Sequence, residues 1–444
     1  MKIKLSTTQI IMLSFLMAIL LGALILCLPI SSASGNATPF IDALFTSTTS
    51  VCVTGLVVVP TFSHWSVFGK AVILLLIQAG GLGIITVTAG IFFNFKKKLS
   101  LNNSVLIQDA FNLNTLSGLS AFIRKVISGT FLVELIGALC YMTVFVPQFG
   151  VKGIWFSFFN SISAFCNAGI DIIGGNSLIN YAENPIINLT TSLLIIIGGI
   201  GFIVWLDVID VIKKRRGFRF LTLHSKIALT FTLILIFGGG LLYFIFEYNN
   251  PQTIKDFSLF GKIQACLFQS VTTRTAGFVS IDQSAITNAS AMLSLILMFI
   301  GGSPVGTAGG IKTVTLAVIL AAFVSSVKNK DETTLFSRSI PLETLKKAIA
   351  VVTMSLFIVI VSSLLLSLVS SASVIDILYE TVSAAATVGL SRNLTPFLNQ
   401  WGKLIVTATM YLGRVGPISL AFLFKTKKTK PAVVKNPTEK ISVG

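Results

Sequence analysis

Charged side chains are scarce in this sequence. Of its 444 residues only 11% are Asp, Glu, Lys or Arg, and only 16 are acidic, whereas about a quarter of a soluble domain is charged. Hydrophobic residues make up 54%, the mean hydropathy is +0.89, and there are 35 Phe residues. An aqueous fold has too little interior to bury this much apolar surface. The composition excludes a soluble globular protein and predicts a polytopic membrane protein.

Histidine and cysteine are also rare, and their positions exclude most catalytic and metal chemistry. The two histidines, His64 and His224, have no nucleophile or metal ligand near them in the sequence. The cysteines are odd in number and lack the spacing of a zinc site or a disulfide framework; they are Cys27, Cys52, Cys140, Cys166 and Cys266. We therefore predict that the chain is not an enzyme and carries no covalent cofactor.

Four short elements, each with a glycine, recur at nearly constant spacing. They are Val53-Thr54-Gly55, Asn167-Ala168-Gly169, Thr275-Ala276-Gly277 and Thr387-Val388-Gly389. Successive glycines are 108 to 114 residues apart, close to a quarter of the chain. Such a period indicates tandem copies of one unit. We predict repeats at residues 1–100, 101–217, 218–332 and 333–424, followed by a basic cytoplasmic tail at 425–444.

Each copy contains a long apolar run, a short run and a second long run. The first runs are Ile10–Pro29, Val126–Pro147, Ile227–Phe246 and Lys347–Ser371. The short runs, which cannot cross a core of about 30 Å as helices, are Phe40–Thr49, Trp155–Phe165, Ile263–Val271 and Val374–Ala385. The second runs are Ala71–Phe95, Ile186–Leu206, a run from Ala291, and Leu404–Leu423. This order predicts an all-α membrane fold of four M1-P-M2 units (span, re-entrant pore helix, span) around one central pore.

Large residues ten positions before each glycine are expected to anchor the short helices in packed protein; they are Phe45, Phe159, Leu267 and Tyr379. The basic residues indicate orientation, although the net charge of +17 would suggest nucleic acid in a soluble protein. Of the 33 Lys and Arg, 24 lie in the termini and in the loops between copies. This bias predicts a multi-pass protein of the cell membrane with both termini in the cytoplasm and no nucleic-acid partner.

The glycine elements suggest a binding site for a cation. Non-helical backbone at membrane depth must be buried in protein or line water. Four such segments around one axis would present a ring of carbonyl oxygens that replaces the hydration shell of a cation, and glycine permits the left-handed backbone this requires. A single glycine would indicate only a turn, but four behind short helices favour a filter. Without a ring of carboxylates, a monovalent cation is favoured over Ca²⁺.

A nearly uncharged stretch at 283–327 is about twice as long as one span requires. It is interrupted at 301–310, where five glycines and Pro304 cannot maintain a helix. Below a filter such a loop would obstruct the water path, although a static kink for close helix packing stays an alternative. Arg414 lies as far after Gly389 as Gly302 lies after Gly277, so we expect its guanidinium to bond to loop carbonyls.

Three segments resemble the Ktr/Trk and HKT family of potassium transporters, most closely the membrane subunits of its Ktr branch, over nearly the whole chain. They are Thr272–Phe278 (TTRTAGF), Gly301–Thr313 (GGSPVGTAGGIKT) and Gly413–Pro417 (GRVGP). The resemblance implies a K⁺ filter whose selectivity glycines are Gly55, Gly169, Gly277 and Gly389. It implies gating by Gly302, Ser303, Pro304, Gly306, Thr307, Gly309, Gly310, Lys312 and Arg414. The sequence departs from the family at Cys52 and Cys166, where relatives more often have Thr or Asn.

The resemblance also implies partners: K⁺, the lipid bilayer, a second copy in a homodimer, and a cytosolic ring of nucleotide-binding RCK subunits. Na⁺ stays open as an activating ion. The alternative function is an ion-coupled secondary transporter that uses buried carboxylates, for which Glu134 and Glu380 are the candidates. Parallel repeats and few buried acids weigh against this alternative. The sequence therefore favours a potassium-translocating pore subunit.

Overall fold

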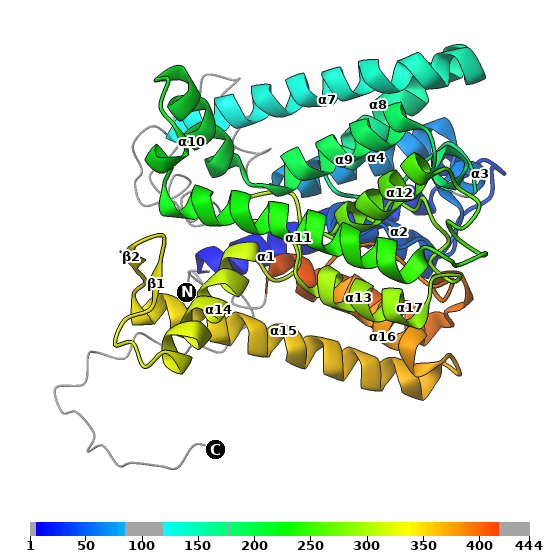
Figure 1. The fold of residues 1–444 in the computed structure, drawn as a ribbon. Coiled ribbons are helices and arrows are strands. Elements are labelled where there is room, and N and C mark those ends of the chain that lie inside the picture. The colour runs from blue at the N-terminus through cyan, green and yellow to red at the C-terminus, as the bar shows by residue number, and fades with distance from the viewer. Residues whose placement is uncertain (1–5, 85–118, 176, 417–444) are drawn as a thin grey trace.

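Four long helices define the architecture of the computed structural model, which describes residues 6–84, 119–175 and 177–416. They are α1 (Thr7–Cys27), α7 (Leu119–Phe149), α11 (Leu223–Glu247) and α15 (Leu342–Val369), each apolar and long enough to cross a membrane. In Figure 1, α7, α11 and α15 run in roughly the same direction. Together with the bent pair below they confirm the prediction of a mostly helical, multi-span protein.

Four short helices follow the long ones in chain order. They are α2 (Phe40–Val51), α8 (Val151–Phe165), α12 (Leu259–Thr272) and α16 (Val374–Ala385), which lie close to the predicted short runs. Each packs against the long helix before it. In the first three units a serine of the short helix donates to a carbonyl of the long helix, and a glycine makes room for it: Ser47 to Ile19 beside Gly22, Ser161 to Glu134 beside Gly137, and Ser270 to Leu235 beside Gly239. Small residues therefore set this close helix packing.

In the described residues, the second part of each unit is one short helix or a pair of helices separated by a break. These helices are α4 (Val67–Leu82), α9 (Pro185–Gly199) with α10 (Phe202–Lys213), α13 (Asn288–Phe299) with α14 (Thr313–Val327), and α17 (Gln400–Val415). The prediction of one continuous span over Ile186–Leu206 is wrong, since α9 and α10 are bent by 98°. Gly201 adopts φ 97° at this bend, a conformation that glycine tolerates. The predicted ends at Phe95 and Leu423 lie outside the described residues.

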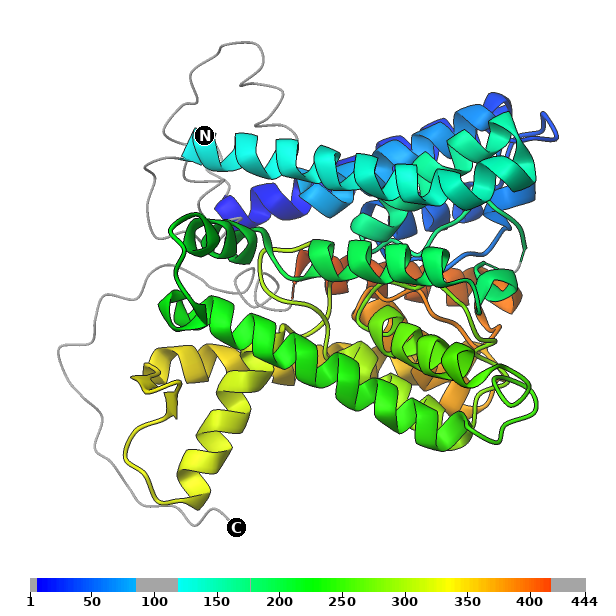
Figure 2. The ribbon, with the colours of Figure 1, turned by 45° about the horizontal axis from the view of Figure 1, so that its top comes forward.

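The remaining elements are short. They are α3 (Thr61–His64), the 3₁₀ turns η1 (Pro29–Ser31), η2 (Ile179–Tyr181), η3 (Phe218–Phe220) and η4 (Thr395–Phe397), and a hairpin of β1 (Thr334–Leu335) and β2 (Arg338–Ser339). The hairpin corrects the all-α prediction; Phe336 and Ser337 between its strands both have positive φ, as a tight hairpin turn requires. Figures 1 and 2 show the start of α1, α10 and the hairpin at one end of the molecule.

Apolar side chains cover the outside of the long helices. Leu24 of α1, Leu132 of α7 and Leu368 of α15 are 58%, 58% and 80% exposed. Each short helix has large side chains that are fully buried, among them Phe45, Phe159 and Tyr379. A surface that is apolar and an interior that contains the short helices fit hydrocarbon rather than water as the surroundings.

Candidate functional site

The four glycine elements share an unusual backbone. In each, the glycine and the residue two positions before it have positive φ: Val53 (55°) with Gly55 (102°), Asn167 (60°) with Gly169 (62°), Thr275 (69°) with Gly277 (80°), and Thr387 (52°) with Gly389 (95°). The residue between them is not in this conformation. A regular strand directs successive residues to opposite faces, whereas left-handed residues at alternate positions allow successive carbonyl oxygens to point to one side.

The four glycines lie against one another in a closed ring. A Cβ atom on Gly55 would meet the carbonyl oxygen of Ala168, and one on Gly169 would meet that of Ala276. A Cβ atom on Gly277 would meet the oxygen of Val388, and one on Gly389 would meet that of Thr54. All four approaches are closer than 3.0 Å, which leaves no room for a side chain. The predicted filter glycines are therefore brought together in chain order, the fourth next to the first.

Hydroxyl groups near the ends of the short helices hold the four glycine elements in place. Thr49 accepts from the N–H of Gly55 at 2.9 Å, and Ser383 accepts from that of Gly389 at 3.0 Å. Ser163 accepts from the N–H of Ile170 at 3.1 Å, and Thr272 donates to the carbonyl of Phe278 at 2.6 Å. None of these four hydroxyls has a role predicted from the sequence, although Thr272 begins the motif Thr272–Phe278. Their spacing of five or six residues before each glycine is the signal that could have found them.

One anchoring residue is less buried than the other three. Leu267, ten residues before Gly277, is only partly buried, and Phe268 is the fully packed residue of α12. The cause is that Thr272 precedes its glycine by five residues, whereas Thr49, Ser163 and Ser383 precede theirs by six. The third unit therefore has one residue fewer between this hydroxyl residue and its glycine.

The ring has an open cavity on one side. The cavity has a volume of about 230 Å³ and is lined by the four ring glycines together with residues of the loops that follow them, among them Asp171, Val279 and Ser391. The short helices end four or five residues before the glycines, so the negative ends of their dipoles lie close to the ring and favour a cation there.

The loop between α13 and α14 contacts the ring elements at the residues with positive φ. The hydroxyl of Thr307 lies 3.3 Å from the Asn167 amide and donates to the carbonyl of Phe165 at 3.2 Å. The N–H of Gly309 donates to the Thr275 hydroxyl at 3.1 Å, and a Cβ atom on Gly309 would collide with Thr387. The loop therefore reaches the elements of units two, three and four.

The same loop fills the break between α9 and α10. The N–H groups of Ser303 and Thr307 donate to the carbonyls of Gly199 and Gly198 at 2.9 and 3.1 Å. In return, the N–H of Phe202 donates to the carbonyl of Val305 at 2.9 Å. Backbone groups freed by the two helix breaks thus satisfy each other, as irregular backbone at membrane depth requires.

Two basic side chains bond to loop carbonyls. Arg414 donates from Nη1 to the oxygen of Thr307 at 2.6 Å and from Nη2 to that of Gly80 at 2.5 Å. Lys312 donates from Nζ to the oxygen of Ala308 at 2.6 Å. The expected contact between Arg414 and the loop is therefore present, and α4 is a second partner that the sequence analysis did not predict.

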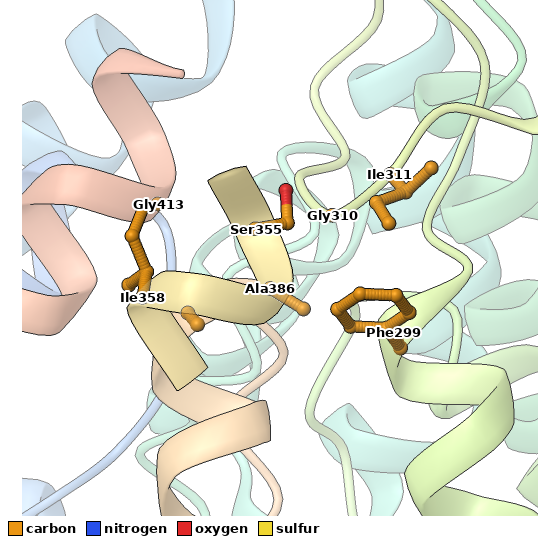
Figure 3. A pocket seen from close by; sticks show the side chains of 8 residues that line it. Phe299, Gly310, Ile311, Ser355, Ile358, Ala386 and Gly413 are labelled. Atoms are coloured by element: carbon orange, nitrogen blue, oxygen red, sulfur yellow. The ribbon is translucent and has the colours of Figure 1, made fainter. Parts of the chain in front are cut away.

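A small cavity separates the loop from the fourth unit. Figure 3 shows Gly310 and Ile311 of the loop facing Ser355 and Ile358, with Gly413 beside them. Its volume of about 20 Å³ has room for about one water molecule. The loop is thus closely packed on this side as well, and displacing it requires its neighbours to move.

The other polar candidates have structural partners. Glu380 accepts from the hydroxyls of Ser391 at 2.7 Å and Thr395 at 2.5 Å, which ties α16 to the loop after the fourth glycine. Glu134 accepts from the Gln78 amide at 3.3 Å. Cys166 also contacts Gln78, and both Cys52 and Cys166 are buried caps at the ends of α2 and α8.

These features define a multi-span membrane protein in which four glycine strands, each preceded by a short helix, close into one ring. The chain belongs to the family of TrkH cation transport proteins, which it matches over residues 6–435. This confirms the family that the sequence motifs indicated.

Similar proteins cover almost the whole chain. The Ktr system potassium uptake protein B of Bacillus subtilis is 39% identical over 443 residues, covering 100% of this chain and 98% of that protein. The potassium/sodium uptake protein NtpJ of Enterococcus hirae is 38% identical over 447 residues, covering 99% and 98%. The crystal structure of the potassium transporter TrkH from Vibrio parahaemolyticus has the same fold, with a TM-score of 0.75 at 16% identity, covering 96% of this chain and 86% of that one.

Proposed function

We propose that this chain is the potassium-translocating membrane subunit of a K⁺ uptake system, and that K⁺ crosses the membrane through the glycine ring. The closed contact of the four glycines with the carbonyls of Thr54, Ala168, Ala276 and Val388 is the observation that carries this proposal. Carbonyl oxygens directed at one axis replace the water around a dehydrated K⁺ ion. The names of the relatives from B. subtilis and E. hirae support K⁺ as the ion.

The filter in this proposal consists of the four elements Val53–Gly55, Asn167–Gly169, Thr275–Gly277 and Thr387–Gly389. The loop at 301–310 is the gate, since it contacts three of these elements on the side away from the cavity. Arg414 and Lys312 hold the loop in its obstructing position through its carbonyls.

The four units have the boundaries given above, and both termini lie in the cytoplasm of a cell with this protein in its plasma membrane. The basic run at 213–216 supports this orientation, because it lies at the same end of the molecule as the start of α1 (Figure 1). Two copies form a homodimer, and a cytosolic ring of nucleotide-binding RCK subunits regulates the loop from that side. Na⁺ is the candidate activating ion.

Ion flux into liposomes tests this function. Purified protein in liposomes should transport K⁺ in preference to Na⁺ down a K⁺ gradient, without an imposed proton or sodium gradient. Protein-free liposomes are the control. Equal K⁺ and Na⁺ flux would contradict the filter. Flux that requires a second ion gradient would instead support coupled transport, and Gln substitutions of Glu134 and Glu380 would then identify the coupling carboxylate.

A further inference from the structure

The cavity outside the glycine ring is chemically asymmetric. Two residues after each glycine, the four units place Val57, Asp171, Val279 and Ser391, all of which line the cavity. Among the described residues that line it, Asp171 is the only one with a titratable side chain. A single unit therefore contributes a carboxylate at the entrance to the ring.

Asp171 is held in a fixed position. Its carboxylate accepts hydrogen bonds from the Ser177 hydroxyl and from the N–H groups of Ile173 and Gly174. Ser177 in turn accepts from the N–H of Val279 at 3.3 Å, which links the loop of the second unit to that of the third. The carboxylate is thus pre-positioned, and these neutral donors leave its charge uncompensated.

The surroundings of Asp171 favour a bound cation. A carboxylate that is partly withdrawn from water is costly unless a positive charge pairs with it. No Lys or Arg is among the described residues that line the cavity. Burial raises the pKa of Asp171 to about 6, so the group is still mostly ionised at pH 7. The other acidic group nearby, Glu380, lies behind Ser391 and Thr395 and bonds to both.

We propose that Asp171 forms an outer binding site for a partly hydrated monovalent cation, which it concentrates at the entrance before the ion enters the ring. The inference rests on the proposed function, with K⁺ as the ion. Ca²⁺ fits less well, because it prefers six to eight oxygen ligands with several carboxylates. A cavity of about 230 Å³ accommodates the ion with part of its water shell.

Asp171→Asn tests the site, because the side chain keeps its shape and its amide oxygen still accepts up to two of the three hydrogen bonds, while the charge is lost. Uptake is measured in cells lacking other K⁺ transporters, as a function of external K⁺. The KM for K⁺ should rise roughly tenfold with little change in the maximal rate, as expected when a charged cleft no longer concentrates the ion. Asp171→Glu should retain most of the affinity.

Two further readouts separate a charge effect from a structural one. The difference between wild type and Asp171→Asn should shrink when N-methyl-D-glucamine chloride raises the external ionic strength, since screening weakens the attraction. Wild-type KM should also rise as external pH falls from 7 to 5, because protonation removes the charge, whereas Asp171→Asn should show a flat profile over this range.

The double variant Asp171→Asn/Val279→Asp returns a carboxylate to the same cavity from a neighbouring unit, and it should recover at least part of the lost affinity. Unchanged KM in Asp171→Asn, or a loss of maximal rate alone, would overturn the outer site. Wild-type protein that takes up no K⁺ would instead refute the proposed function itself, so the two failures are distinguishable.

Discussion

The guanidinium of Arg414 bridges two segments that lie far apart in the sequence, the carbonyl of Thr307 in the loop and the carbonyl of Gly80 in α4. Thr307 also contacts the Asn167 amide below the second glycine. One side chain of the fourth unit thereby fixes the loop against the helix of the first unit. If the loop closes the path, this contact stabilises the closed state.

Arg414→Ala should increase K⁺ flux. The substitution removes two charge-assisted hydrogen bonds, and a hydrogen bond to a charged group contributes about 1.5–3 kcal/mol. The closed state loses this stabilisation, so the open fraction rises. Flux of ⁸⁶Rb⁺ into liposomes at equal protein density measures the effect. Arg414→Lys retains the positive charge and a donor for one of the two carbonyls, so its flux should be intermediate. Flux at the wild-type level in both variants would argue against this role.

Deletion of residues 304–308, within the segment Ser303–Gly309, should also increase K⁺ flux. The flux should become less dependent on a cytosolic partner. The deletion removes Thr307, the acceptor of Arg414. Combining it with Arg414→Ala should therefore give less than the sum of the two effects, since both changes remove one interaction. A folded deletion variant that conducts no faster than the parent would mean that the loop is only a structural kink.

Gly55→Ser should weaken the preference for K⁺ over Na⁺ by about tenfold, which corresponds to a change of about 1.4 kcal/mol. Gly55 has φ 102°, and a Cβ atom there would lie 2.5 Å from the carbonyl oxygen of Ala168. Gly35→Ser is the matched control, because Gly35 also has positive φ but nothing lies within 4 Å of its Cβ position. The ratio of K⁺ to Na⁺ flux should fall only in Gly55→Ser. A drop of equal size in the control would point to general misfolding.

The orientation can be tested by labelling single cysteines in intact cells. With Cys27 and Cys140 replaced by Ser, Arg215→Cys should react only after permeabilisation, and Lys152→Cys should react from outside. Both positions are exposed in the structure, and the basic run that contains Arg215 indicates the cytoplasmic side. Lys97→Cys and Lys428→Cys, like Arg215→Cys, should react only after permeabilisation. External labelling of Arg215→Cys would reverse the proposed topology.

Much of the site could be predicted from the sequence because its elements are local and repeated. The spacing of Gly55, Gly169, Gly277 and Gly389 identified the ring. The lengths of the apolar runs, long enough or too short to cross a membrane, identified the long and short helices. The shift from Leu267 to Phe268 escaped prediction because Thr272 precedes its glycine by five residues instead of six, and only the hydrogen bond of its hydroxyl reveals this change of register.

Other features depend on contacts between distant segments. The break between α9 and α10 is stable because the loop at 301–310 supplies hydrogen-bond partners to Gly198, Gly199 and Phe202. The glycines near this bend are equally compatible with a continuous, closely packed helix. The bond from Arg414 to Gly80 and the place of Asp171 at the entrance likewise require the tertiary structure.

Locating a bound ion tests the central claim most directly. Crystals of the protein grown in Rb⁺, which substitutes for K⁺ and scatters anomalously, should show an anomalous peak on the axis between the carbonyl oxygens of Thr54, Ala168, Ala276 and Val388. The peak should weaken when Na⁺ replaces Rb⁺ and in Gly55→Ser. Rb⁺ absent from this axis, with the four strands ordered and flux of K⁺ intact, would contradict the account.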